Sequence, residues 1–308
     1  LNLEGVQKEI EKVTGQIRAD LDAYNIESRS YGKAESKKAD FLEFELRPII
    51  DEMYKNKITD ESLTEFLVMR HAEEGNKVIA ERNPNRQDRQ DGGTGVTYKE
   101  REEYSKKLDP KKLKVFESIA KKVDSILNET REMLEKGGII TPEQRKALED
   151  MFEFYVPLNR EGSEYSLPTP NYRKVGDFLK SRTGSRKKVI DVLSNIAVNR
   201  EIAIYRAEQE KVHRAVYGLF VMNPNPDFAM AVSPDAVKNK AALIAELESF
   251  YDLDTAEATK LVDNIMTEPT KEVYSKEQNI VSTILDTNAK YKDFVLPVKI
   301  NGKDRFVF

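Results

Sequence analysis

The chain has 308 residues, which is long enough to bury a substantial core in one large or two ordinary domains. Its 50 basic and 54 acidic side chains nearly cancel, to a formal charge of −4, which excludes a protein that binds nucleic acid over its whole surface. The absence of cysteine excludes disulfides, thiolate zinc sites and a cysteine nucleophile. A charged share of 34% without any tryptophan favours a mainly α fold.

Apolar residues spaced three and four apart predict a first helix that runs to about residue 28. A second apolar stripe, from Phe41 to Met53, predicts another helix, in which Pro48 marks either a kink or a start. A third helix is expected to begin at Thr59 or Asp60 and to run toward His71.

Three further helices carry recognisable starts. Thr97 and Glu100 have the spacing of a capping box, in which each side chain satisfies a free backbone amide of the first turn. Asp109-Pro110 predicts the start of a long helix that stops at Gly137-Gly138. Thr141-Pro142 predicts the next capped start.

The loop of residues 155–172 is rich in proline and is the best candidate for a domain boundary. We therefore expect an N-terminal helical region, 1–155, and a C-terminal helical region, 156–308.

The expected C-terminal region is a multi-helix array that ends in a small β-hairpin. A long central helix is predicted over about residues 186–221. Ser233-Pro234 and Asp254 predict two more helix starts, and residues 271–289 are predicted to be helical. Asn301-Gly302 lies between two β-rich runs, which predicts the hairpin.

The two ends of the sequence suggest an excerpt of a longer chain. It begins at Leu1 without an initiator methionine, and it stops inside the last predicted strand. No apolar run approaches the roughly 20 residues of a membrane span, so no span is expected in this segment.

The two histidines each lie three residues from a glutamate, as His71 with Glu74 and as Glu210 with His213. Such pairs share a helix face, and Glu-x-x-His occurs in di-metal helix bundles. Acidic residues are so common here that either pair is unremarkable by chance. A metal-dependent enzyme with a His71 or His213 site is therefore our third hypothesis, and we expect no metal and no cofactor.

The glycines of "DGGTG" do not form a phosphate-binding loop. Gly92, Gly93 and Gly95 follow a polar stretch rather than an apolar strand, and no Gly-Lys-Ser/Thr follows them. Glycines before a capped helix are typical of a turn with positive φ. No nucleophile with an adjacent base is recognisable elsewhere, so the sequence favours a segment that is not an enzyme and leaves an enzyme as the third hypothesis.

Residues 173–188 form a basic cluster, with seven cations against Asp177 alone, a local charge of +6. The seven are Arg173, Lys174, Lys180, Arg182, Arg186, Lys187 and Lys188. Cations at a helix start oppose the helix dipole, so an anion should answer them. Two possibilities stay open: the cluster binds an external anion such as DNA phosphate, or it forms a salt-bridged or solvated face of the same protein. The first possibility makes a nucleic-acid-associated module our second hypothesis.

Several short motifs, in a fixed order over roughly residues 30–308, resemble the large polyvalent protein associated domain. The motifs are "RHAEEGN", "DGGTGVT", "YVPL", "RTGSR", "IYRAEQEKV", "NPNP" and "VKINGKDRFVF". Positions that match the pattern, without a known role, are His71, Glu74, Asn76, Gly92, Gly93, Gly95, Tyr155 and Pro157. Gly75 departs from the pattern, which more often has arginine there.

The resemblance implies a context more than a reaction. Modules of this family occur in very large proteins of bacteriophages, prophages and conjugative elements, which are thought to be packaged in the particle and delivered with the genome. We therefore expect a structural or interaction segment that lies in the virion interior and then in the host cytoplasm. Its expected partners are other domains of the same protein and other virion proteins.

Overall fold

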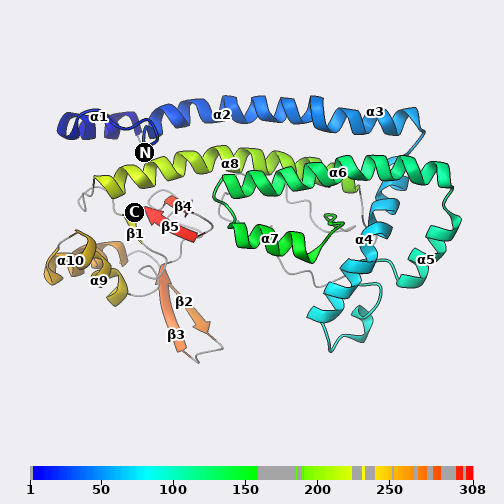
Figure 1. Ribbon diagram of the computed structural model, residues 1–308. Helices are drawn as coiled ribbons and strands as arrows, with labels where there is room; N and C mark the ends of the chain where they lie inside the picture. The colour runs from blue at the N-terminus through cyan, green and yellow to red at the C-terminus, as the bar shows by residue number, and fades with distance from the viewer. Residues whose placement is uncertain are drawn as a thin grey trace. The chain divides into compact units, whose positions relative to one another are not determined.

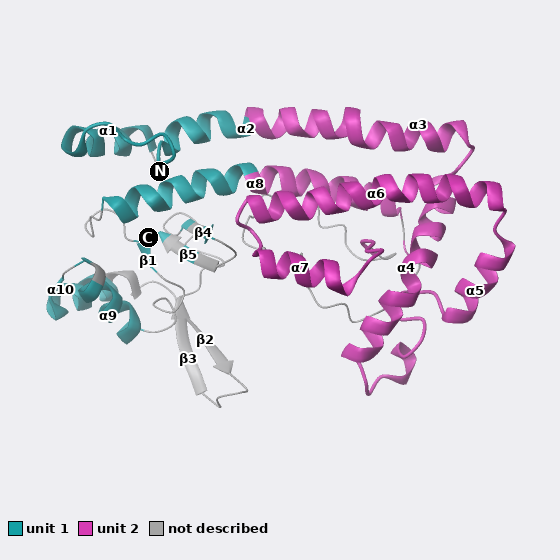
Figure 2. Ribbon diagram, viewed as in Figure 1, with its two compact units in different colours: residues 1–31, 208–308 teal, residues 32–207 magenta. Residues whose placement is uncertain are grey.

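The computed structural model describes residues 3–158, 185, 189, 191–223, 231–232, 240–251, 253–266, 270–275, 280–285, 296–300 and 303–307. These residues are mainly helical with a few short strands, which confirms the predicted fold class (Figure 1). The chain divides into two compact units, unit 1 of residues 1–31 and 208–308 and unit 2 of residues 32–207 (Figure 2). The limits of these units fall inside two helices, and the predicted domain boundary at residue 155 stays a prediction.

Unit 2 consists of helices that enclose one main core. In chain order these are the end of α2 (Ala23–Asp40), η1 (Phe41–Leu46), α3 (Arg47–Lys55), α4 (Asp60–Arg82), η2 (Gln87–Arg89), α5 (Tyr98–Lys107), α6 (Pro110–Lys136), α7 (Pro142–Met151) and the first half of α8 (Val192–Met222). The core contains Phe41, Ile49, Leu67, Ile119 and Ile196, each almost without exposed surface. Helices α3, α4, α6 and α8 therefore share one apolar centre.

The N-terminal helices differ from the prediction. Helix α1 (Leu3–Thr14) ends before Gly15, whose φ of 85° is a conformation that glycine adopts without strain, so one helix to residue 28 is wrong. Helical structure resumes at Ala23 and continues without a break to Lys55. Pro48 falls in the first turn of α3, where its missing amide costs little, and the preceding segment η1 is a π-helix.

The predicted caps are confirmed. Thr97 and Glu100 form a reciprocal capping box at α5, and Thr141 does the same with Gln144 at α7. Asp109 accepts a hydrogen bond from the amide of Lys111 at the start of α6. Thr59 caps α4, which therefore begins at Asp60.

The long helix α8 begins at Val192, six residues later than predicted. Asp191 has a φ of 32°, and its carboxylate accepts a hydrogen bond from the amide of Ser194, 2.9 Å away. The residue therefore serves as the helix N-cap, and the side-chain hydroxyl of Thr64 accepts the amide of Val192 at 3.1 Å.

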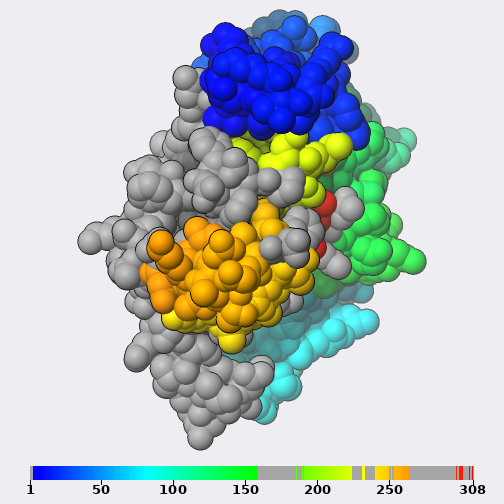
Figure 3. Space-filling view, turned by 90° about the vertical axis from the view of Figure 1, so that its left-hand side faces the viewer, coloured from blue at the N-terminus to red at the C-terminus, as the bar shows by residue number. Residues whose placement is uncertain are grey.

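Unit 1 has two separate apolar clusters. One joins α1 and the second half of α8 to the last strands, through residues such as Leu3, Val216 and Val298. The other joins α9 (Lys240–Tyr251) to α10 (Thr255–Met266), through Leu247 and Val262. The atoms of α9 and α10 form one continuous body in the space-filling view (Figure 3).

The C-terminal strands confirm one prediction and correct another. Strands β4 (Leu296–Ile300) and β5 (Lys303–Val307) pair antiparallel, as expected on either side of Asn301-Gly302, and β1 (Ala231–Val232) extends the sheet. The helix predicted over residues 271–289 is wrong, because β2 (Thr270–Ser275) and β3 (Ile280–Leu285) form a second antiparallel pair. Both strands are rich in β-branched residues, which favour strands over helices.

Candidate functional site

Four residues of the "RHAEEGN" motif, His71, Ala72, Gly75 and Asn76, are buried in unit 2. His71 is on α4 with 0% of its surface exposed, and its Nδ1 is 3.0 Å from Oε1 of Glu74, one turn further along the helix. The Glu74 carboxylate also accepts hydrogen bonds from the backbone amides of Glu153 and Phe154, both at 2.8 Å. One glutamate therefore joins α4 to the segment that follows α7.

Asn76, on the next turn of α4, holds the glycine loop. Its side-chain oxygen accepts hydrogen bonds from the amide and the hydroxyl of Thr94, at 2.8 and 2.9 Å, and its amide group donates to the carbonyl of Val96 at 2.8 Å. Asn76 and Thr94 are both fully buried. Because all these groups are satisfied inside the protein, burying them costs little.

The glycines of these two motifs allow close packing and tight turns. A Cβ on Gly75 would lie 2.6 Å from Nε2 of His71 and 2.6 Å from the methyl group of Thr94, and one on Gly93 would lie 2.6 Å from Ile79. Gly92 and Gly95 have φ values of 78° and 98°, as the sequence predicted for a turn. The structure therefore leaves no room for an arginine at position 75.

The "YVPL" motif completes the same cluster. Phe152 and Tyr155 place their rings 5.3 and 6.5 Å from the His71 imidazole, and Val156 and Pro157 are buried. We name the group of His71, Glu74, Gly75, Asn76, Gly93, Thr94, Phe152 and Tyr155 the motif cluster. The structure thus brings together three of the sequence motifs, whose residues are up to 84 positions apart.

The second histidine has a different partner. His213, on the half of α8 in unit 1, has its Nδ1 3.6 Å from Oε2 of Glu210, and Glu210 accepts a hydrogen bond from the backbone amide of Lys299 in β4. Glu210 therefore joins α8 to the C-terminal sheet. Throughout the part of the chain that the structure describes, no group of three or more histidine, aspartate or glutamate side chains could hold a metal ion.

The predicted anion site falls almost wholly outside the described residues. Of residues 173–188, only Ser185 is described, and it carries no charge; its amide donates to the carbonyl of Gly93 at 2.9 Å. Arg173, Lys174, Arg182, Arg186, Lys187 and Lys188 therefore stay a prediction. Among the described helices, none is long and apolar enough to cross a membrane.

An acidic cleft lies beside the motif cluster. Its volume is about 650 Å³, and Asp60, Glu61, Glu65 and Asp191 supply four carboxylates around Thr94, Gly95 and Val96. Burial raises the pKa of Asp60, and the negative charges of Asp191 and Glu61 raise it further. The sequence did not reveal this cleft, because its acids come from two helix starts 130 residues apart.

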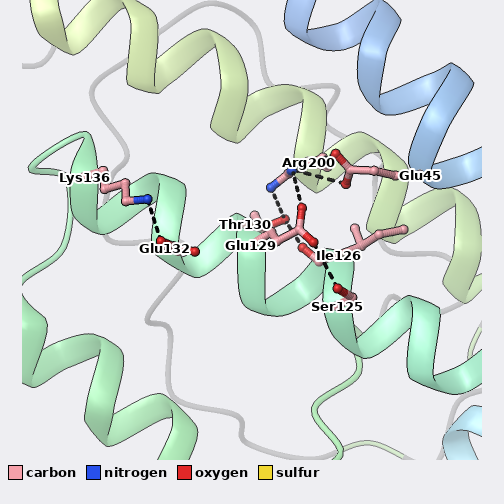
Figure 4. Close-up of polar contacts among 8 residues, drawn as sticks. All are labelled: Glu45, Ser125, Ile126, Glu129, Thr130, Glu132, Lys136 and Arg200. Atoms are coloured by element: carbon pink, nitrogen blue, oxygen red, sulfur yellow. Dashed lines mark hydrogen bonds and ion pairs between the residues drawn. The ribbon is translucent and has the colours of Figure 1, made fainter.

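A buried ion cluster in unit 2 was also missed by the sequence. Arg200 of α8 is 5% exposed and reaches both oxygens of Glu45, at 3.0 and 3.1 Å, and Glu129 at 3.3 Å (Figure 4). Its other amino group donates to the hydroxyl of Thr130 at 3.4 Å. Burial raises the pKa of Glu45 despite the attraction of Arg200, and the charge of Glu129 adds to the rise.

These arrangements hold segments together more readily than they transform a substrate. A general base must reach the proton that it removes, and the fully buried His71 faces Glu74 and two aromatic rings instead. The motif residues serve as packing and hydrogen-bonding groups that fix α4, the glycine loop and residues 152–157.

No protein-family model, no curated protein and no solved structure matches this chain.

Proposed function

We propose that this chain is a non-enzymatic packing module of a very large phage or mobile-element protein. Its partners are neighbouring domains of the same protein and other proteins of the particle. The ordered motifs support the context, since they resemble the large polyvalent protein associated domain. The motif cluster supports the lack of catalysis in this segment, because its polar groups bind one another inside unit 2.

The observation that carries the interaction role is a group of exposed apolar side chains along η1 and α3. Leu42, Phe44, Ile50 and Tyr54 are all exposed, Phe44 to 72% and Tyr54 to 88%. In unit 2, only Tyr98 is a large exposed hydrophobic residue outside this group among the described residues. A concentration of apolar side chains on one helical run is typical of a surface that packs against another protein.

The polar neighbours of this group suit a partner that is itself a helix. Arg47 and Glu43 form an ion pair along the same helical run at 2.7 Å, and Asp51 and Lys55 are exposed beside Tyr54. Apolar positions flanked by charges of both signs are the pattern by which helices choose a partner and an orientation. We propose that these side chains pack against a neighbouring domain, first in the particle interior and, after delivery, in the host cytoplasm.

The experiment replaces Phe44, Ile50 and Tyr54 with serine in the full protein and follows its incorporation into particles. Intact particles are treated with protease, opened, and analysed by mass spectrometry for peptides of this chain. We expect protected peptides from the wild-type protein and several-fold fewer from the triple variant, with the thermal unfolding midpoint of the chain unchanged. Tyr98→Ser is the matched control, and it should be incorporated normally.

Equal incorporation of the triple variant and the control would contradict the proposal. So would a turnover by the isolated chain that disappears when one of its own side chains is replaced.

A further inference from the structure

A second pocket, distinct from the acidic cleft, lies between α4, α5 and α6 in unit 2. It has a volume of about 520 Å³. Its apolar lining comes from Phe66, Met69, Leu108, Leu113 and Phe154. Small-molecule sites usually measure about 300–1,000 Å³ and combine such a lining with a few well-placed polar groups. The pocket is large enough for a phenyl or branched alkyl group.

The cationic side chains of the pocket are held in fixed positions. Arg70 pairs with Asp124, and its guanidinium lies 4.6 Å from the centre of the Phe154 ring. Arg101 is 2.9 Å from the carboxylate of Glu73. Because these contacts orient the guanidinium groups before any ligand arrives, a ligand would lose less free energy in ordering them.

The pocket also offers donors that lack an acceptor. Within the described part of the chain, no residue accepts a hydrogen bond from the hydroxyl of Tyr104, which is partly buried, or from the ammonium of Lys121, which is exposed to solvent. Burial raises the pKa of Tyr104 to about 12, and the charge of Glu65 contributes. The hydroxyl therefore keeps its proton at neutral pH and remains a donor.

The groups of the lining that are open to a ligand include more donors than acceptors. Arg70 is paired with Asp124 and Arg101 with Glu73, which leaves the charges of Lys121 and Glu117, and the buried Nε of Arg70 has no hydrogen-bond partner among the described residues. We propose that this pocket binds a carboxylate carried on a phenyl or branched alkyl group. The apolar group contacts the five apolar side chains, and the carboxylate accepts hydrogen bonds from Tyr104, Lys121 and Arg70. The inference goes beyond the packing function and does not depend on it.

Isothermal titration calorimetry of the full chain with 3-phenylpropanoate tests the proposal. The neutral amide of the same acid is the matched ligand, since it keeps the shape and loses the charge. We expect the amide to bind at least about tenfold more weakly, because a hydrogen bond to a charged group contributes more than one between neutral groups. Amide and acid of equal affinity, or no binding of the acid, would overturn the proposal.

Three variants assign the contacts. Tyr104→Phe removes only the hydroxyl, and Lys121→Gln removes the ammonium charge, so each should weaken the acid severalfold and the amide clearly less. Lys112→Gln is the control for charge, because Lys112 is an exposed residue of the same helix outside the pocket. Arg70→Gln combined with Asp124→Asn removes the fixed guanidinium without leaving a lone charge, and should weaken the acid by about tenfold or more.

Unchanged affinity in both single variants, or an equal loss in Lys112→Gln and Lys121→Gln, would overturn the assignment even if the double variant unfolds. Two sources could supply the ligand, a free organic acid or the carboxyl end of another chain. An acetylated tripeptide that ends in phenylalanine distinguishes them: tighter binding than 3-phenylpropanoate assigns the pocket to a chain end, and weaker binding to a free acid.

Discussion

Gly75 illustrates how a single residue is determined by its neighbours. The backbone of α4 passes so close to His71 and Thr94 that a methyl group at position 75 would lie 2.6 Å from both. Gly32, on α2, has no neighbouring atom within 4 Å of the same position. The two helical glycines therefore offer a matched pair, one required by packing and one not.

We expect Gly75→Ala to lower the free energy of unfolding by about 1–3 kcal/mol, because the added methyl group must displace the buried imidazole or the threonine. Gly32→Ala should raise it by about 0.5–1 kcal/mol, since alanine loses less conformational entropy in a helix. Urea unfolding of both variants provides the measurement. Equal effects at the two positions would contradict the close packing at the motif cluster.

The protonation of Glu45 should make the stability of the protein depend on pH. Its pKa in the folded protein is raised above the ordinary value of 4.5, so the folded state binds this proton more tightly than the unfolded chain does. Loss of this proton therefore lowers the free energy of unfolding as the pH rises from 4.5 through the pKa that Glu45 has in the folded protein. We expect Glu45→Gln, which resembles the protonated acid, to match the wild type in urea unfolding at pH 4 and to be at least as stable at pH 7. A clear loss of stability at pH 7 would show that the ion pair outweighs the burial of the charge.

Replacing Arg200, unlike replacing Glu45, should lower the stability of the protein at pH 7. Arg200→Met keeps much of the side-chain volume but leaves Glu45 and Glu129 without their shared cation. We expect the free energy of unfolding at pH 7 to fall by about 1–3 kcal/mol, because the partly buried Glu45 loses the cation that compensates its charge. The loss should shrink when Glu45→Gln is added, and additive effects of the two changes would contradict their coupling.

At the scale of elements, the start of α8 depends on a hydrogen bond from a distant helix. The hydroxyl of Thr64 on α4 accepts the amide of Val192, the first residue of α8, and both residues are buried. A helix start leaves its first amides without partners inside the helix, so a buried one needs an acceptor from elsewhere. Thr64 thus supplements the cap that Asp191 provides.

We expect Thr64→Val, which has nearly the same shape, to lower the free energy of unfolding by about 1–3 kcal/mol, because the buried amide loses its acceptor. Thr64→Ser retains the hydroxyl and should lose less stability. Thermal unfolding and the hydrogen exchange of the Val192 amide report the two effects. Slow exchange of that amide in Thr64→Val would contradict this role.

At the scale of the whole molecule, charge limits what the chain can bind. The net charge of −4 opposes the binding of DNA, and the basic cluster at 173–188 is the one segment for which phosphate binding is an alternative hypothesis. We expect only weak binding of duplex DNA at about 150 mM salt in fluorescence anisotropy. Tight binding that falls steeply with salt, and is lost when Arg182, Arg186, Lys187 and Lys188 are neutralised together, would instead favour the nucleic-acid hypothesis.

The sequence by itself determined the local structure of this protein. The caps at Thr59, Thr97, Asp109 and Thr141 and the C-terminal strand pair follow from hydrogen bonds and backbone preferences among residues a few positions apart. The break after Gly15 and the β2–β3 pair were missed, although a glycine at the break and the β-branched residues of β3 were local signals for both.

Only the tertiary structure decided which residues form the candidate sites. The motifs include His71, Glu74, Asn76 and Thr94, but they do not indicate that Thr94 bonds Asn76 or that Glu74 accepts the amides of Glu153 and Phe154. The contact of Arg200 with Glu45 joins residues 155 positions apart, and no periodicity in the sequence specifies such a pair. Burial and long-range charge pairing depend on how the helices pack in three dimensions, and local spacing carries no record of that packing.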